Sequence, residues 1–314
     1  NLAIEILYVL YCKKKLDIQF IFSHFNFDLF KEIAVFSSYI FINIVIDQIN
    51  WNVDKFIIGR FRGTTGVAIY GLAANINTLY LSFSSVISNL FVPRVNQIVS
   101  TTDDNTALTD LMIRVGRVQF IVLCLICNGL IVFGKPFISM WAGKDYIGAY
   151  PIALLLILPV TIPLVQNIGI EIQRARNMHK FRSFVYLFIA VANIIMSIPL
   201  TKKHGEIGAA LGTAVSLIIG NGILINWHYH IRMGLDMKRF WKSILSFAPV
   251  IVVMAVIGFG IYNYIDLYNI KNFILFVLLY SAVYFISMWK LGMNSSERGL
   301  LTNPLNKLKD RIRK

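Results

Sequence analysis

Residues 150–170 read YPIALLLILPVTIPLVQNIGI. This run holds no charged side chain and is about 20 residues long, the length that a helix needs to cross the ~30 Å hydrocarbon layer of a membrane. Runs of similar length and composition lie at about 33–58, 67–92, 115–134, 184–200, 207–227, 244–264 and 272–290. Lipid offers backbone groups no partner, and the runs are too long for barrel strands. We therefore predict an all-α polytopic membrane protein with eight complete transmembrane helices.

The composition agrees with this prediction. Of the 314 residues 57% are hydrophobic and only 15% are charged, and the mean hydropathy is +0.66. An ordinary soluble domain has about 25% charged residues, so a soluble globular protein is excluded. Three cysteines are too few to hold a disulfide scaffold together.

The formal net charge of +14 would suit a nucleic-acid-binding protein, but it has a simpler explanation. If the Lys13–Lys15 side is cytoplasmic, alternate loops and the C-terminal tail carry 22 of the 30 lysines and arginines on that side. This excess is the positive-inside pattern of membrane proteins. We therefore expect a cytoplasmic C-terminus, outward loops near Arg62, Lys144, Lys203 and Asp266, and no nucleic-acid partner.

The two ends of the chain differ in character. Residues 1–12 (NLAIEILYVLYC) are apolar and predict the end of a transmembrane helix whose start is missing, so we expect the chain to be a fragment. Residues 291–314 form a basic cytoplasmic tail, in which Leu305, Leu308 and Ile312 lie at helical spacing. This tail could form an interfacial helix on an anionic leaflet or remain solvated.

Polar residues follow one face of each of the first two complete helices. They are spaced three and four residues apart and are Asn43, Asp47, Asn50 and Asp54 in the first helix, and Asn75, Thr78, Ser82, Ser85 and Asn89 in the second. Such faces avoid lipid, so they either line a wet cavity or form hydrogen bonds across a helix interface.

Asp47 is the most central carboxylate of any complete span, where a charge costs about 2.5–3.5 kcal/mol. An acid at this depth can bind H⁺ or Na⁺, as a coupled transporter requires. The alternative is a protonated aspartate that only packs against a neighbouring helix. Catalytic and metal-binding motifs are mostly absent: Cys124 and Cys127 have redox-like spacing but lie inside an apolar helix without further Cys or His nearby in sequence. We therefore expect no enzyme activity, no metal and no cofactor beyond the coupling ion.

Two patterns concern helix geometry. Pro159 and Pro163, followed by Gln166, should bend the helix at 150–170, because proline removes backbone donors. Small residues at every fourth position (Gly208, Gly212, Ser216 and Gly220) should let another helix approach closely.

Several segments resemble one transporter family. They are DKFIIGRFRG at 54–63, VAIYG at 67–71, Pro93-Arg94, EIQRARNMHKFR at 171–182 and IGAALGTA at 207–214. Together they are similar to Wzx-type polysaccharide repeat-unit flippases of the multidrug/oligosaccharidyl-lipid/polysaccharide exporter superfamily. The resemblance covers most of 26–230, and beyond that only the hydropathy agrees.

The resemblance implies two six-helix lobes around a central cavity. Residues 13–32 would be the cytoplasmic linker between lobes, 33–228 the second lobe, and 229–290 a cytoplasmic loop with two additional helices. The implied substrate is an undecaprenyl-pyrophosphate-linked oligosaccharide, moved across the bacterial cytoplasmic membrane for O-antigen, capsule or exopolysaccharide synthesis. Its pyrophosphate would need basic partners at the inner mouth, and the candidates are Arg94, Arg114, Arg117 and Arg174. Membrane lipid is a further partner, and a polysaccharide polymerase and a chain-length regulator are expected protein partners.

Other functions stay open at this point. A cation-coupled multidrug exporter of the same superfamily would line its cavity with acidic and aromatic residues, whereas the stripes here are mainly amide and hydroxyl. A membrane enzyme of polysaccharide assembly would need a large outer loop or intramembrane His/Asp pairs. The four arginines could also be ordinary cytoplasmic anchors. A structural scaffold would not need a central aspartate.

Overall fold

The computed structural model describes residues 5, 8, 9, 11, 26–299 and 302. Within this part, the side chains of residues 35–36, 39–40, 42–44, 46–47, 49–51 and 179 lie outside the description. Residues 1–45 and 46–314 form two units, and apart from the start of α2 the features below belong to the second unit. The described residues are about 89% helical and contain no strand, as the sequence predicts.

The first element, α2 (Phe27–Asn89), is two helices joined at a sharp turn. Gly63 at the turn has φ 72°, a left-handed conformation that glycine adopts without a Cβ clash. A hydrogen bond between Tyr70 and Asp54 shows that the second half of α2 folds back on the first. The predicted spans at 33–58 and 67–92 correspond to these two halves.

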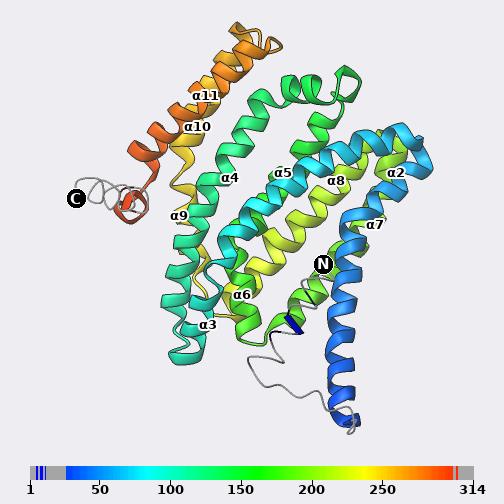
Figure 1. The fold of residues 1–314 in the computed structure, drawn as a ribbon, viewed down its shortest axis with the longest axis vertical. Helices are drawn as coiled ribbons and strands as arrows, with labels where there is room; N and C mark the ends of the chain where they lie inside the picture. Colours follow the sequence, from blue (N-terminus) through cyan, green and yellow to red (C-terminus); the bar gives the residue numbers. More distant parts are fainter. Residues whose placement is uncertain (1–4, 6–7, 10, 12–25, 300–301, 303–314) are drawn as a thin grey trace. The chain divides into compact units, whose positions relative to one another are not determined.

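The remaining elements follow in chain order (Figure 1). They are α3 (Val92–Thr101), α4 (Asn105–Trp141), η1 (Lys144–Tyr146), α5 (Ala149–Val165), α6 (Asn167–Ala175), α7 (His179–His204), α8 (Glu206–Leu217), η2 (Ile218–Ile225), η3 (His228–Arg232), α9 (Met237–Leu245), α10 (Ala248–Tyr264), α11 (Ile270–Ser287) and η4 (Met288–Gly292). The elements η2, η3 and η4 are π-helical.

Among the described residues, five continuous helices are long and apolar enough to cross a membrane. They cover Asn105–Trp141, Lys180–His204, Glu206–Arg232, Met237–Tyr264 and Ile270–Gly292. A sixth span arises if α5 and α6 are taken as one helix that bends by 44°. A bend in this run is confirmed; it lies at Gln166, three residues after Pro163, while α5 itself continues through both prolines.

Helices α4, α5, α7 and α8 pack in sequence, α4 on α5, α5 on α8, and α8 on α7. The ridge of small residues on α8 faces α7, as predicted. A Cβ on Gly208 would lie 2.0 Å from the Leu200 carbonyl oxygen, and one on Gly212 would lie 2.4 Å from Ser197 Oγ. The small side chains therefore allow these two helices to pack backbone against backbone.

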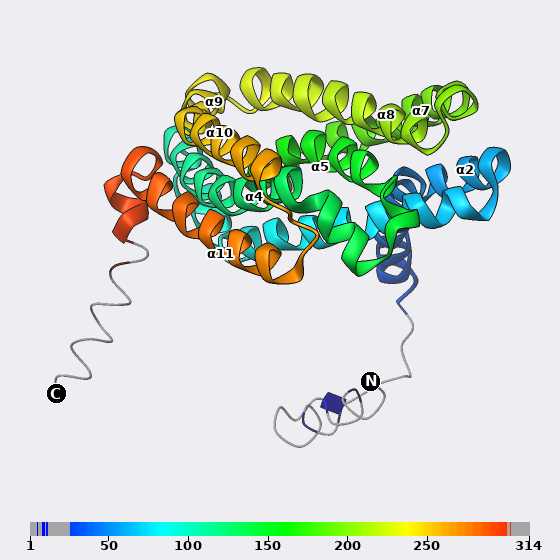
Figure 2. The ribbon, with the colours of Figure 1, turned by 90° about the horizontal axis from the view of Figure 1, so that it is seen from above.

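The C-terminal pair, α10 and α11, lies along α4 (Figure 2). Their shared core contains Phe133 of α4, whose ring meets the rings of Phe273 and Tyr280 edge to face. The Tyr284 hydroxyl donates a 2.6 Å hydrogen bond to the carbonyl of Ile121. Apolar surface alone gives little preference for one partner in lipid, so these polar contacts fix how the pair docks.

Candidate functional site

Asp54 forms the centre of a buried polar cluster. Its side chain is 1% exposed, and its Oδ2 accepts hydrogen bonds from Tyr70 Oη at 2.7 Å and from Thr213 Oγ1. The turn at Gly63 brings Tyr70 to Asp54, and the packing of α8 supplies Thr213. Within the part of the chain that the structure describes, Asp54 Oδ1 has no hydrogen-bond partner.

Two residues of α7 complete the cluster. Asn193 Oδ1 lies 3.3 Å from Thr213 Oγ1 and accepts a 2.7 Å hydrogen bond from Ser197 Oγ. Thr213 has a single hydroxyl proton, which cannot serve both Asp54 and Asn193 well. The cluster therefore has no hydroxyl proton left for the second carboxylate oxygen, Asp54 Oδ1.

An unpaired, buried carboxylate oxygen favours a cation. Buried polar groups are costly unless they are paired, and a bound proton or alkali-metal ion would pair the free Asp54 oxygen. Carboxylate, hydroxyl and amide oxygens are the donors that hard cations prefer. No group of three His, Cys, Asp or Glu side chains gathers among the described residues.

This arrangement corrects the role expected for Asp54. The sequence placed it on a cavity-lining stripe, but the structure buries it between α2, α7 and α8. The side chains of Asn43, Asp47 and Asn50 lie outside the description, so their predicted role as a stripe stays a prediction.

The second predicted stripe lies on an open face of α2. All five of its members are exposed, namely Asn75, Thr78, Ser82, Ser85 and Asn89. The three hydroxyls bond only to carbonyls of their own helix, at 2.6–2.9 Å. A different face of α2, with Tyr80, Ser84 and Ser88, packs against α4 and α5.

The four candidate arginines separate into two groups. Arg94, Arg114 and Arg174 are exposed; Arg94 donates to Gln97 Oε1 at 2.7 Å, and Arg174 donates to Glu171 Oε1 at 2.9 Å. Their guanidinium groups remain accessible, so a role in binding pyrophosphate stays a prediction for these three.

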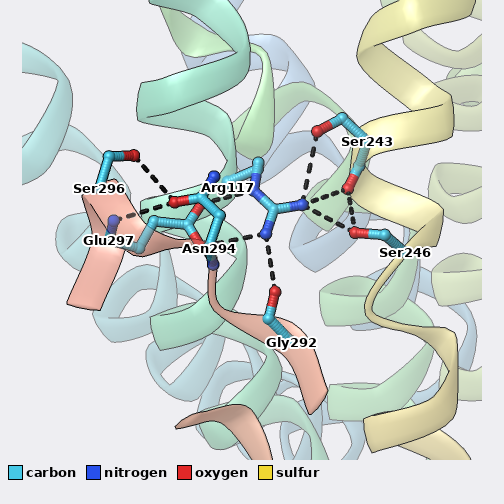
Figure 3. A network of polar contacts seen from close by, with 7 residues as sticks. All are labelled: Arg117, Ser243, Ser246, Gly292, Asn294, Ser296 and Glu297. Carbon is cyan, nitrogen blue, oxygen red and sulfur yellow. Dashed lines mark hydrogen bonds and ion pairs between the residues drawn. The ribbon is translucent and has the colours of Figure 1, made fainter. Parts of the chain in front are cut away.

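Arg117 does not fit that role, because it is buried and fully hydrogen-bonded (Figure 3). Its Nη1 donates to Ser243 O and Ser246 Oγ, each at 2.7 Å, and its Nη2 donates to Gly292 O at 2.8 Å and Glu297 Oε2 at 3.0 Å. Its Nε donates to Glu297 Oε1. These bonds occupy the five N–H donors of a guanidinium group, which leaves none for pyrophosphate.

Glu297, in the predicted tail, forms reciprocal hydrogen bonds with Asn294. Its Oε2 accepts from the Asn294 N–H at 2.9 Å, while its own N–H donates to Asn294 Oδ1 at 2.9 Å. This reciprocal pair is a capping box, which starts a short helical turn after η4. The bonds between Glu297 and Arg117 therefore hold residues 294–298 against α4, within the segment predicted as a basic cytoplasmic tail. Leu305, Leu308 and Ile312 lie outside the described residues.

Sequence reasoning did not single out Tyr70, Asn193, Ser197 or Thr213. A weak signal was present, because Asn193 and Ser197 are four residues apart in the otherwise apolar run at 184–200. Nothing in the spacing joins that pair to Asp54, which lies more than a hundred residues earlier in the chain.

Comparisons with known proteins agree with the fold. A family model described as "Polysaccharide biosynthesis protein" matches residues 1–151. A probable flippase, AglR, from Haloferax volcanii is 23% identical over 78% of this chain and 51% of its own length. The teichuronic acid biosynthesis protein TuaB from Bacillus subtilis is 20% identical over 76% of this chain and 49% of its own.

A solved structure shares the fold. It is the lipid II flippase MurJ in an inward closed conformation, with a TM-score of 0.61 and 19% sequence identity, over 91% of this chain and 60% of that one. The chain spans about half the length of the curated relatives that it matches. These likenesses agree with the resemblance seen in the sequence: the chain is similar to a polysaccharide biosynthesis family over its first 151 residues and to proteins named as flippases, and it shares the fold of MurJ.

Proposed function

We propose that the chain takes part in moving a lipid-linked oligosaccharide, carried on undecaprenyl pyrophosphate, across the bacterial cytoplasmic membrane for surface polysaccharide synthesis. In this proposal the chain acts as a transporter and not as an enzyme. The two halves of α2 count as separate spans, which makes eight spans with a cytoplasmic C-terminus. Residues 33–228 form one of two lobes, and α10 and α11 are the additional pair.

The observation that carries the proposal is the exposed amide and hydroxyl face of α2. Polar side chains avoid lipid, so this face needs a wet or polar surface opposite it. A cavity between two lobes would meet that need, and its amides and hydroxyls could replace the water around a sugar. The lipid tail would stay in the membrane. The accessible Arg94, Arg114 and Arg174 would serve the pyrophosphate at the inner mouth.

The same proposal assigns ion coupling to buried acids. Asp54, with one carboxylate oxygen unpaired and hydroxyl and amide oxygens around it, offers a place for H⁺ or Na⁺. Asp47 remains a second candidate. Binding of the ion would neutralise the carboxylate and so alter the packing of α2, α7 and α8, which meet at this cluster.

Polysaccharide export in a flippase-null strain tests both the transport function and the ion coupling. The longer protein that contains these residues should restore export, and residues 1–314 alone should insert without restoring it. We expect Asp54→Asn and Asp47→Asn each to reach the membrane at normal abundance and lose export, because asparagine keeps the shape but cannot titrate. Asn89→Ala should weaken export, whereas Asn96→Ala, on the exposed surface of α3, should not.

Each outcome bears on a separate part of the proposal. Normal export by both aspartate variants would refute coupling at these acids, and full export by residues 1–314 alone would refute the two-lobe arrangement. Efflux of organic cations in place of polysaccharide export would favour the multidrug exporter. Polysaccharide polymerase and chain-length regulator partners would be sought by cross-linking in the same strain.

A further inference from the structure

Two neighbouring helices are broken next to each other in the membrane-spanning part. The first break is at Gln166, between α5 and α6, where φ is −107° and ψ is 19°. Pro159 and Pro163 lack the N–H groups that would otherwise continue the α5 hydrogen bonds. The carbonyl of Leu164, near the end of α5, accepts a 3.0 Å hydrogen bond from Ser84 of α2. The break is therefore stabilised by a side chain of another helix.

The second break is a change in the hydrogen-bond pattern of the helix that begins with α8, which stays continuous from Glu206 to Arg232. From Ile218 to Ile225 this helix changes to the π form of η2, in which each turn holds an extra residue. Gln166 Nε2 donates to the Asn221 carbonyl at 3.3 Å, and Asn226 Nδ2 donates to the same carbonyl at 2.8 Å. The two breaks are thus joined directly by side-chain amides.

The amides at this junction are only partly paired. Gln166 Oε1 and Asn221 Nδ2 are buried and make no hydrogen bond within the described part of the chain. One is an acceptor and the other a donor, and they belong to the two residues that already touch. A buried unpaired polar group costs about 1–3 kcal/mol. A second arrangement in which these two atoms pair would recover part of that free energy.

On the cytoplasmic side of the breaks, α6 packs closely against η3 and α3. A Cβ on Gly169 of α6 would lie 2.5 Å from the ring of Tyr229 in η3, so the two elements are in close contact. Gln173 of α6 lies 3.2 Å from His228 Nδ1, and the ring of Phe181 stacks on that histidine at 4.2 Å. Element α3 packs on α6 as well.

Arg176, directly after α6, forms hydrogen bonds to three neighbouring segments. Its guanidinium donates to Asp103 Oδ1 at 2.8 Å, to Asn105 Oδ1 at 2.6 Å and to Met233 O at 2.8 Å. These partners come from the α3–α4 loop, the start of α4 and the end of η3. On the other side of the breaks, α5 and α8 contact each other through Ile152, Ala153, Ala209 and Ala210.

We infer that the paired breaks at Gln166 and Asn221 form one hinge, about which α3, α6 and η3 swing as a single unit relative to α5 and α8. Arg176 acts as the positioning residue that keeps this cytoplasmic unit together. The inference deepens the proposed transport function, because such a unit would gate the inner end of the transport path. Conformation can be measured without transport, so an experiment can refute the hinge without refuting the transport function.

The structure sets the size of the movement. Element α6 has nine residues, so it is about 13.5 Å long at 1.5 Å per residue. Straightening the 44° bend would move its far end by about 10 Å, from the chord of that angle at this length. Such a change is well within the range of distances between spin labels.

The test uses the full chain in lipid nanodiscs, with native cysteines replaced by serine and spin labels on pairs of introduced cysteines. Lys144→Cys with Arg174→Cys spans the hinge. Lys144→Cys with Leu158→Cys lies on one side of it, and Asn96→Cys with Arg174→Cys lies within the cytoplasmic unit. All four positions are exposed. We expect two distances, up to about 10 Å apart, for the first pair and one distance for each of the others.

Substitutions then test which residues determine the two distances. Pro159→Ala with Pro163→Ala restores the missing donors and should remove the bent population. Pro199→Ala, at an exposed proline inside α7, is the matched control and should leave both distances unchanged. Arg176→Ala should broaden the Asn96–Arg174 distance alone. Asn221→Ala, a smaller change at the second break, should shift the ratio of the two populations.

A single narrow distance for Lys144–Arg174 in the wild-type chain would overturn the hinge. The hinge would also be overturned if the ratio of the two populations stayed unchanged both in the double variant Pro159→Ala, Pro163→Ala and in Asn221→Ala. Two distances for Asn96–Arg174 would show that the cytoplasmic segments do not move as one unit.

Discussion

Removing Arg117 should destabilise the chain far more than removing an arginine from its surface. In Arg117→Ala, the Glu297 carboxylate, which is 3% exposed, would keep only the Asn294 N–H as a donor. The carbonyls of Ser243 and Gly292 would each lose the bond from Arg117, and Ser243 would keep only the one from the Ser246 hydroxyl. Breaking a buried ion pair on one side costs about 3–5 kcal/mol, since an uncompensated charge stays buried. We expect a loss of this size for Arg117→Ala.

Equilibrium unfolding of the chain in detergent micelles, followed by tryptophan fluorescence, measures this loss. Arg239→Ala is the matched control, because Arg239 pairs with Asp110 at 2.8 Å but both side chains are more than half exposed. Exposed pairs contribute about 0–1 kcal/mol, so the control should change little. Glu297→Gln should resemble Arg117→Ala. The reasoning is refuted if Arg117→Ala costs no more than Arg239→Ala.

Three further predictions concern packing, the buried acid and topology. Gly208→Ala should cost about 1–3 kcal/mol of unfolding free energy, because its Cβ would meet a backbone carbonyl, whereas Gly260→Ala in the open surface of α10 should stabilise by up to about 1 kcal/mol. Tyr70→Phe should cost about 1–3 kcal/mol in the same assay, since it removes a hydrogen bond to a buried carboxyl group. In intact cells, an impermeant thiol reagent should label Lys144→Cys and not Lys238→Cys; the reverse pattern would overturn the orientation.

Features that depend on neighbouring residues could be predicted from the sequence. The bend between α5 and α6 follows from two prolines in one apolar run, and the close approach of α7 to α8 follows from small residues at every fourth position. Both depend on helix geometry and local chemistry, which spacing alone specifies.

Features that join distant segments could not be predicted in this way. Asp54 meets Thr213 across 159 positions, and Arg117 meets Glu297 across 180, so neither partner can be found from spacing. The same limit explains why Asp54 was placed on a cavity wall. Helical periodicity says which residues share a face, but only the packed structure says which neighbour that face meets.

The distance between Arg117 and Glu297 along the chain also sets an order of events during biosynthesis. Glu297 is made 180 residues after Arg117, which takes roughly 10–40 s at 5–20 residues per second. During that interval α4 must be accommodated with its arginine unpartnered, held near the membrane surface where water can solvate it. Formation of the ion pair is therefore a late step, which can be completed only after α11 has entered the bilayer.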